Sequence, residues 1–243
     1  MAALGDHPHL VSMRFAWTEP SDDGTHFFLL MDKCEESVAT RLSITGDAFD
    51  ERELVGIAAA VCSGLRHIHA RGIAHMDVKP DNIYTTEGGG FKLGDFGCAT
   101  LLAPSLQHAT PATDEGDVRY LAAEVLAGDR STLDKADMFA LGASLYELAT
   151  RIPLPKQGPT FHDVRQGRLR MLPSYSVALH RLIKQLMAPK ASDRPSAEAV
   201  LASSLLQGQP KEAPPPTSST EDAPAQKAPP QHYGGLCLQR VAR

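Results

Sequence analysis

The chain has 243 residues, of which 42% are hydrophobic and 22% are charged, and its formal net charge is −5. This length allows one large domain or two small ones, and the mild acidity gives no electrostatic reason to expect a nucleic acid or an anionic membrane as partner. No apolar run approaches the roughly 20 residues that cross a bilayer. The four cysteines are scattered without a C-x-x-C pair, which favours a reducing compartment over a disulfide framework or a zinc site.

The first elements along the chain are two short apolar runs that are typical of strands. Residues 10–17 and 26–32 are separated by the polar stretch 18–25, so the simplest interpretation is a hairpin with a turn over that stretch. A helix is predicted over 51–70, because apolar residues recur there at i, i+3, i+4 and i+7. Gly72 follows in a capping position.

Residues 1–207 read as mainly helical, with a few strands at the front. Residues 82–95 predict two strands joined by a glycine turn, and residues 134–150 are apolar almost all round, as in a helix at the centre of a domain. Two amphipathic helices are expected at about 176–188 and 196–206. From Gly208 onward the chain is rich in Pro, Ala, Ser and Thr without an apolar period, which predicts a folded domain over 1–207 and a disordered tail over 208–243.

A short polar loop carries the chemistry. In HMDVKPDN, residues 75–82, the side chains of Asp77, Lys79 and Asn82 precede the predicted two-stranded ribbon, and Asp95 follows it in GDFG. Carboxylate and amide oxygens suit Mg²⁺, while a carboxylate free of metal is able to accept the proton of a hydroxyl group. An ammonium group neutralises charge on a phosphoryl group in transfer. The pattern therefore indicates phosphoryl transfer.

These motifs resemble those of protein kinases. HMDVKPDN is similar to the kinase catalytic loop and DFG to the metal-binding triplet. The segments AAE (122–124), ADMFALG (136–142) and DRP (193–195) match further kinase landmarks in order and spacing. Longer stretches such as GIAHMDVKPDNIY and EGDVRYLAAEVL resemble the Wee-type kinases that restrain mitosis, particularly those of plants and algae. The resemblance covers about residues 3–206.

The resemblance implies an α+β kinase fold: a mainly helical large lobe with a remnant of the β-sheet of the small lobe. It implies that Asp77 is the catalytic base, that Lys79 neutralises phosphate charge, and that Asn82 and Asp95 hold Mg²⁺. The resemblance also implies which residues surround the adenine of ATP. Met31 would be the gatekeeper, and the backbone of the hinge residues Asp32 and Cys34 would bond the base. Tyr84 would pack beneath the adenine ring.

The implied function is transfer of the γ-phosphate of ATP to a protein hydroxyl. By resemblance, the substrate is a cyclin-dependent kinase modified on an inhibitory tyrosine, so the protein would restrain mitotic entry in the nucleus or otherwise act in the cytoplasm. A monomer is expected. The sequence KPDN is the pattern usual in serine/threonine kinases, so the loop alone does not predict tyrosine.

Met76 stands where many kinases have an arginine that pairs with a phosphorylated activation loop. A thioether cannot make that pair. We therefore expect the activation loop, roughly residues 95–124, to be ordered without phosphorylation, with Asp114, Glu115 and Asp117 supplying fixed negative charge.

The 76 residues before Asp77 contain neither the glycine-rich loop nor the strand lysine of a complete kinase, nor its regulatory-helix glutamate. The glycines at 87–90 read as a hairpin turn instead. The expectation is a kinase truncated at its N-terminus, by a truncated or mispredicted reading frame, that binds ATP weakly and transfers phosphate negligibly by itself. The alternatives are a non-catalytic kinase-like binding module and an inactive fragment.

Other polar residues are predicted to have structural roles. His7 and His9 suggest a metal pair but match a common kinase turn between a helix and a strand, and Cys98 lacks a close basic neighbour, so an inert thiol is expected. The remaining structural predictions are that His75 packs against Phe96, that Glu124 and Arg194 form a buried ion pair, and that Asp137 accepts hydrogen bonds from the catalytic-loop backbone.

Overall fold

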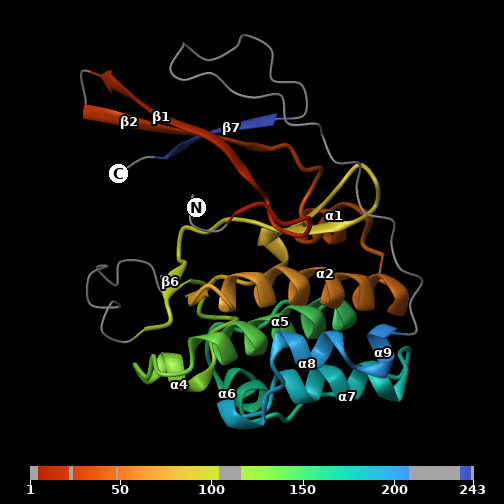
Figure 1. Ribbon diagram of the computed structural model, residues 1–243. Helices are drawn as coiled ribbons and strands as arrows, with labels where there is room; N and C mark the ends of the chain where they lie inside the picture. The colour runs from red at the N-terminus through yellow and green to blue at the C-terminus, as the bar shows by residue number, and fades with distance from the viewer. Residues whose placement is uncertain (1–4, 22–23, 48, 104–115, 208–235, 242–243) are drawn as a thin grey trace.

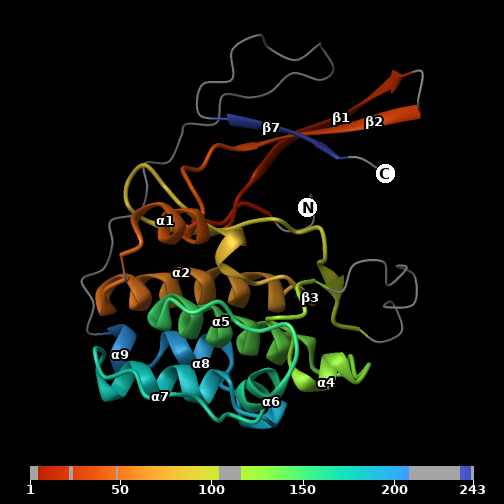
Figure 2. The same cartoon turned by 180° about the vertical axis from the view of Figure 1, so that it is seen from behind.

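A three-stranded sheet lies above a stack of helices, as the two ribbon views of the computed structural model show (Figure 1 and Figure 2). The structure describes residues 5–21, 24–47, 49–103, 116–207 and 236–241. The sheet has the order β1-β2-β7, and two further sheets have two strands each. The mixture of helices and small sheets agrees with the predicted α+β class.

The predicted hairpin is confirmed, but its turn is shorter than expected. Strands β1 (Met13–Ser21) and β2 (Gly24–Asp32) pair antiparallel from Ser21 opposite Gly24 back to Met13 opposite Met31. The prediction of a turn over 18–25 was therefore wrong, because most of that stretch is strand. The described residues there are exposed wherever a burial class is given, so polar side chains are tolerated and composition does not mark the strand end.

Within the tail predicted over 208–243, the structure describes one element. Residues Leu236–Val241 form strand β7, which pairs antiparallel with β2 from Phe27 opposite Val241 to Asp32 opposite Leu236. The stretch ends in Val241, and β-branched residues are enriched in strands. Without it β2 would present a row of unpaired backbone groups along one edge. Residues 208–235 and 242–243 lie outside the described residues.

The helix predicted over 51–70 is α2 (Glu51–His69). A capping box starts it: the Asp50 side chain accepts from the Glu53 amide at 2.8 Å, and the Glu53 side chain accepts from the Asp50 amide at 3.0 Å. Its predicted apolar face is fully buried, at Leu54, Ile57, Ala58, Val61, Leu65 and Ile68.

The central helix predicted over 134–150 is α5 (Leu133–Thr150), and it is buried nearly all round. It packs closely on α7 (Val177–Leu186), because Gly142 has no side chain: a Cβ there would lie 2.7 Å from atoms of Leu186 and Met187. The position of α7 also confirms the helix predicted at about 176–188. No described helix is both long and apolar enough to span a membrane.

The single helix predicted over 196–206 is two short helices, α8 (Ala197–Leu201) and α9 (Ser204–Gln207). The break lies at Ala202 and Ser203, and the Ser203 carbonyl begins α9 by accepting the amides of Leu206 and Gln207. Three short helices were not predicted, namely α1 (Val38–Thr45), α4 (Ala123–Leu126) and α6 (Pro159–Arg165).

The remaining elements surround the polar loop. Strands β3 (Ile73–Ala74) and β6 (Thr100–Leu101) pair with each other, and the short 3-10 helix η2 (Pro80–Asn82) leads into β4. The predicted ribbon is confirmed as β4 (Ile83–Thr85) paired with β5 (Phe91–Leu93). A second 3-10 helix, η3 (Ala191–Asp193), precedes α8.

The predicted ion pair between Glu124 and Arg194 is confirmed. The Arg194 side chain is 0% exposed and its Nη2 donates to Glu124 Oε2 at 3.0 Å. Arg194 also donates to the carbonyls of Ala188 and Pro189, so its charge is fully compensated. The pair joins α4 to the segment between η3 and α8.

We expect Glu124→Gln to lower the free energy of unfolding by about 3 kcal/mol, because it leaves the buried Arg194 guanidinium without its counter-ion. The matched control is Asp163→Asn, which breaks the exposed pair with Arg168 and should cost less than about 1 kcal/mol. Urea denaturation of the full chain measures both values. Equal losses in the two variants would contradict the structural role of the buried pair.

Candidate active site

The polar loop and the β4–β5 ribbon lie between the sheet and α2, where the chain is yellow in Figure 1. Asn82 immediately precedes β4 and Asp95 follows β5 by two residues. Ile83 pairs with Leu93, and the Gly94 amide donates to the Asn82 carbonyl at 2.9 Å. The ribbon thus brings Asn82 and Asp95 to the same end, although 13 residues separate them in sequence.

The loop backbone is fixed from below by Asp137 of α5. The amides of His75 and Met76 each donate to the Asp137 carboxylate at 2.8 Å, and His69 Nε2 lies 2.8 Å from Asp137 Oδ2. Asp137 is 1% exposed. The predicted architectural role of Asp137 is therefore confirmed, and these bonds hold Met76 in a left-handed conformation with φ of 64°.

The Asp77 carboxylate is the centre of a buried polar cluster. Lys79 Nζ donates to Asp77 Oδ2 at 2.7 Å, Asn82 Nδ2 donates to the same oxygen at 2.8 Å, and the Asp117 amide donates to Oδ1 at 3.2 Å. Partial burial disfavours the charge of Lys79, but the hydrogen bond to Asp77 and nearby negative charges raise its pKa above the ordinary value. The structure thus brings the predicted catalytic residues and the amide together.

His75 links the loop to the DFG segment. It is fully buried, and burial lowers its pKa, so the ring is neutral. Its Nδ1 accepts from the Asp77 amide at 3.3 Å, which leaves Nε2–H to donate to the Gly94 carbonyl at 3.0 Å. The ring centroid lies 4.9 Å from that of Phe96, which confirms the predicted packing. The bridge between the two loops was not predicted from the sequence.

The residues predicted around adenine lie along the end of β2 and on β4. Met31 and Asp32 end β2, and the segment after Cys34 pairs with β4: the Glu35 amide donates to the Thr85 carbonyl at 3.0 Å. Burial raises the pKa of Tyr84, and the negative charges of Asp95 and Cys34 add to the effect.

Asp32 has an additional role that the sequence did not predict. Its carboxylate accepts from Arg14 Nε at 2.6 Å and from Lys92 Nζ at 2.9 Å, and its amide donates to the Ser12 carbonyl at 3.0 Å. Burial opposes the charge of Asp32, but the hydrogen bonds from Arg14 and Lys92 lower its pKa. The predicted hinge is thus tied to both β1 and β5. The partners lie 18 and 60 residues away, so no local pattern signals them.

The donor set at Asn82 and Asp95 fits a hard divalent cation. Both hydrogens of the Asn82 amide are directed to Asp77, which leaves Oδ1 as the atom of this side chain that is able to bind a cation. Asp95 is exposed, has φ of 60°, and its carboxylate accepts from the Gly97 amide at 3.2 Å. Magnesium commonly takes one or two protein oxygens and completes its shell with phosphates and water. No group of three or more His, Cys, Asp or Glu among the described residues could hold a metal by itself.

Three sequence predictions for other residues have mixed outcomes. His9 Nδ1 lies 3.1 Å from the Phe91 carbonyl, and burial beside His67 lowers the pKa of His7 to about 4, as suits structural histidines. Asp114 and Glu115 lie outside the described residues. Asp117 is described, and Arg119 binds its carboxylate, so its charge is compensated locally. The inert thiol of Cys98 stays a prediction.

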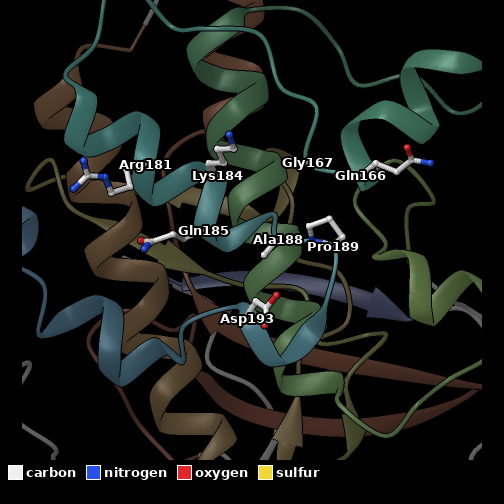
Figure 3. Close-up of a pocket in the computed structure, with 8 residues that line it drawn as sticks. All are labelled: Gln166, Gly167, Arg181, Lys184, Gln185, Ala188, Pro189 and Asp193. Atoms are coloured by element: carbon white, nitrogen blue, oxygen red, sulfur yellow. The ribbon is translucent and has the colours of Figure 1, made fainter.

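A separate cavity of about 390 Å³ lies at the opposite end of the helical part, beside α7 (Figure 3). It is lined by Gln166, Gly167, Arg181, Lys184, Gln185, Ala188, Pro189 and Asp193. The side chains of Arg181 and Gln166 point away from each other in Figure 3, and none of the predicted site residues lines this cavity. The predicted site residues therefore lie apart from this cavity.

Comparison with known proteins agrees with the motifs. The family model described as protein kinase domain matches residues 1–206. The chain is 41% identical over 201 residues to the Wee1-like protein kinase of Oryza sativa subsp. japonica, an alignment that covers 83% of this chain and 36% of that protein.

Two further relatives show the same relation. The Wee1-like protein kinase of Arabidopsis thaliana is 37% identical over 201 residues, covering 83% of this chain and 38% of the relative. Wee1-like protein kinase 2 of Danio rerio is 36% identical over 231 residues, covering 84% and 42%. The chain thus spans about two fifths of the length of the curated relatives it matches.

Proposed function

The chain belongs to the protein kinase domain family, and from that premise we propose that it transfers the γ-phosphate of ATP to a hydroxyl group of a protein. The observation that carries the proposal is the buried Asp77 carboxylate held by Lys79 and Asn82, at the end of the ribbon that also carries Asp95. A buried acid with an ammonium group and an amide oxygen beside it is suited to this reaction.

Each residue would have a distinct part in the transfer. Asp77 would orient the substrate hydroxyl and accept its proton as the hydroxyl oxygen bonds to the γ-phosphorus and the bond to the β-phosphate oxygen breaks. Lys79 would neutralise negative charge on the moving phosphoryl group. Asn82 Oδ1 and the Asp95 carboxylate would hold Mg²⁺, which protein kinases generally use together with ATP and which offsets phosphate charge.

The nucleotide would lie along β2 and β4. We propose that the backbone of Asp32 and Cys34 bonds adenine, that Met31 is the gatekeeper and that Tyr84 packs beneath the ring. Because the Asp32 amide already donates to Ser12, that N–H is committed within the protein. Residues 1–207 would form a large lobe with a remnant of the small-lobe sheet.

The proposed substrate is an inhibitory tyrosine of a cyclin-dependent kinase, modified in the nucleus. This proposal rests on similarity to the Wee1-like kinases of Oryza sativa and Arabidopsis thaliana. A second candidate function is a kinase-like module that binds partners without turning over ATP. It is favoured by the observation that these 243 residues contain neither a G-x-G-x-x-G loop nor a V-A-I-K lysine.

The proposal is tested in a chimera in which the 201 aligned residues of the Oryza sativa relative are replaced by their counterparts from this chain. We expect the chimera to form phosphotyrosine on a cyclin-dependent kinase. We expect Asp77→Asn to lower kcat by about a thousandfold, because an amide cannot take the hydroxyl proton.

The matched control is Asp81→Asn, which removes an exposed carboxylate of the same loop and should leave kcat nearly unchanged. A chimera without activity, or an Asp77→Asn variant with near wild-type kcat, would contradict the proposed function. Phosphoserine or phosphothreonine in place of phosphotyrosine would contradict the substrate but not the reaction.

Met76 supports a further expectation about regulation. Met76 is 7% exposed and belongs to a small apolar cluster with Leu121, near the end of the activation loop, and Val125, just after it. Apolar packing of Met76 thus holds the end of the activation loop. An arginine at this position would instead need a phosphate group on the loop as its partner. This contact supports the proposal that the loop is ordered without phosphorylation.

We therefore expect activity of the chimera to be independent of phosphorylation of the activation loop. The measurement is the rate of phosphotyrosine formation before and after treatment with a phosphatase that is removed before the assay. Rates that agree within about twofold are expected, since no charge pair is lost. A large fall in rate that rephosphorylation restores would refute the proposal.

A further inference from the structure

The backbone of the activation segment comes very close to the catalytic loop at Gly116. Gly116 has φ of 66°, a conformation that side chains rarely adopt. A Cβ at this position would overlap the Met76 carbonyl oxygen and would lie 3.3 Å from Asp77 Oδ1. Only a residue without a side chain therefore allows this approach.

The close approach lets one amide reach the catalytic carboxylate. The amide of Asp117, the next residue, donates to Asp77 Oδ1 at 3.2 Å. Lys79 and Asn82 both donate to the other oxygen, Oδ2. Within the part of the chain that the structure describes, the Asp117 amide is thus the hydrogen-bond donor that fixes Oδ1.

The segment that carries this amide is itself held firmly. The Asp117 carboxylate accepts from Arg119 Nη2 at 2.6 Å and from Nε at 3.0 Å, and although burial opposes the charge, these bonds lower the pKa of Asp117. The Tyr120 hydroxyl donates to Glu147 of α5 at 3.0 Å. Arg165 of α6 donates to the Val118 carbonyl at 2.6 Å.

We propose that Gly116 is a positioning residue, and that it acts by letting the Asp117 amide hold the Asp77 carboxylate in one orientation. With Oδ2 bound by Lys79 and Asn82 and Oδ1 bound by Asp117, the plane of the carboxylate is fixed before substrate arrives. The hydrogen bond from the Asp117 amide to Asp77 is a feature of the structure and does not depend on the proposed function. Its effect on rate rests on the proposed function, in which Asp77 takes the hydroxyl proton.

The structural part is tested by amide hydrogen exchange in the full chain, followed by NMR. Gly116→Ala should accelerate exchange of the Asp117 amide by about tenfold or more, because the added methyl group displaces it from Asp77. The matched control is Gly128→Ala: Gly128 has φ of 82° but nothing lies within 4 Å of its Cβ. It carries similar backbone strain without the collision, so exchange at Asp117 should not change.

A second variant keeps this test decisive if Gly116→Ala does not fold. Asp77→Ala removes the acceptor and leaves Gly116 intact, so it should also accelerate exchange at Asp117, whereas Asp81→Ala should not. Unchanged exchange at Asp117 in Asp77→Ala would overturn the proposal, and so would equal acceleration in Gly116→Ala and Gly128→Ala.

The catalytic part is tested in the chimera described above. Gly116→Ala should lower kcat by about a hundredfold while KM for ATP stays within about twofold, because the base is misplaced and the nucleotide site is not. Gly128→Ala should keep both constants. Unchanged kcat in Gly116→Ala would overturn the positioning role, whereas full activity in Asp77→Asn would instead overturn the proposed function, irrespective of the exchange result.

Discussion

The carboxylate of Asp137 is the fixed point on which the site depends. It lies in α5, a helix buried nearly all round, and accepts the amides of His75 and Met76. Each hydrogen bond to a charged group contributes about 1.5–3 kcal/mol, which is enough to offset the cost of about 1–3 kcal/mol for a left-handed residue such as Met76. Because the loop cannot relax, Asp77 is presented in one place.

Two kinds of contact then connect this loop to the activation segment. Apolar packing joins the Met76 side chain to Leu121 and Val125, while backbone contacts join Met76 and Asp77 to Gly116 and Asp117. Neither kind of contact requires a phosphate group on the activation segment. A kinase built in this way would depend on packing and on one glycine for order that other kinases obtain by phosphorylation.

The sequence predicts those parts of the structure that local patterns determine. The 3.6-residue period of α2 and the continuous apolar character of α5 are sufficient for both helices, and the spacing of the motifs is sufficient to bring Asn82 and Asp95 to one end of a ribbon. Asp137 and the Glu124–Arg194 pair were predicted because their residue types recur at known positions of a familiar family.

The remaining features depend on contacts between distant segments. The pairing of β7 with β2 joins residues more than 200 positions apart, and the Asp32 cluster draws its cations from two other strands. The close approach at Gly116 likewise cannot be predicted from the sequence, because a glycine occurs in a chain for many different structural reasons. Only the position of the Met76 carbonyl in the folded chain shows why a glycine is needed at this position.

We propose that Asn82 and Asp95 form one cation site with a nucleotide, beside Asp77. Its most direct test is paramagnetic line broadening in NMR spectra of the full chain with ATP, with Mn²⁺ as a probe that accepts the same oxygen ligands as Mg²⁺. We expect the amide signals of Asn82 and Asp95 to broaden first and to recover with excess Mg²⁺, while those of Gln166 and Lys184 at the distant cavity remain sharp. Broadening at the distant cavity alone, or equal broadening at both places, would contradict it.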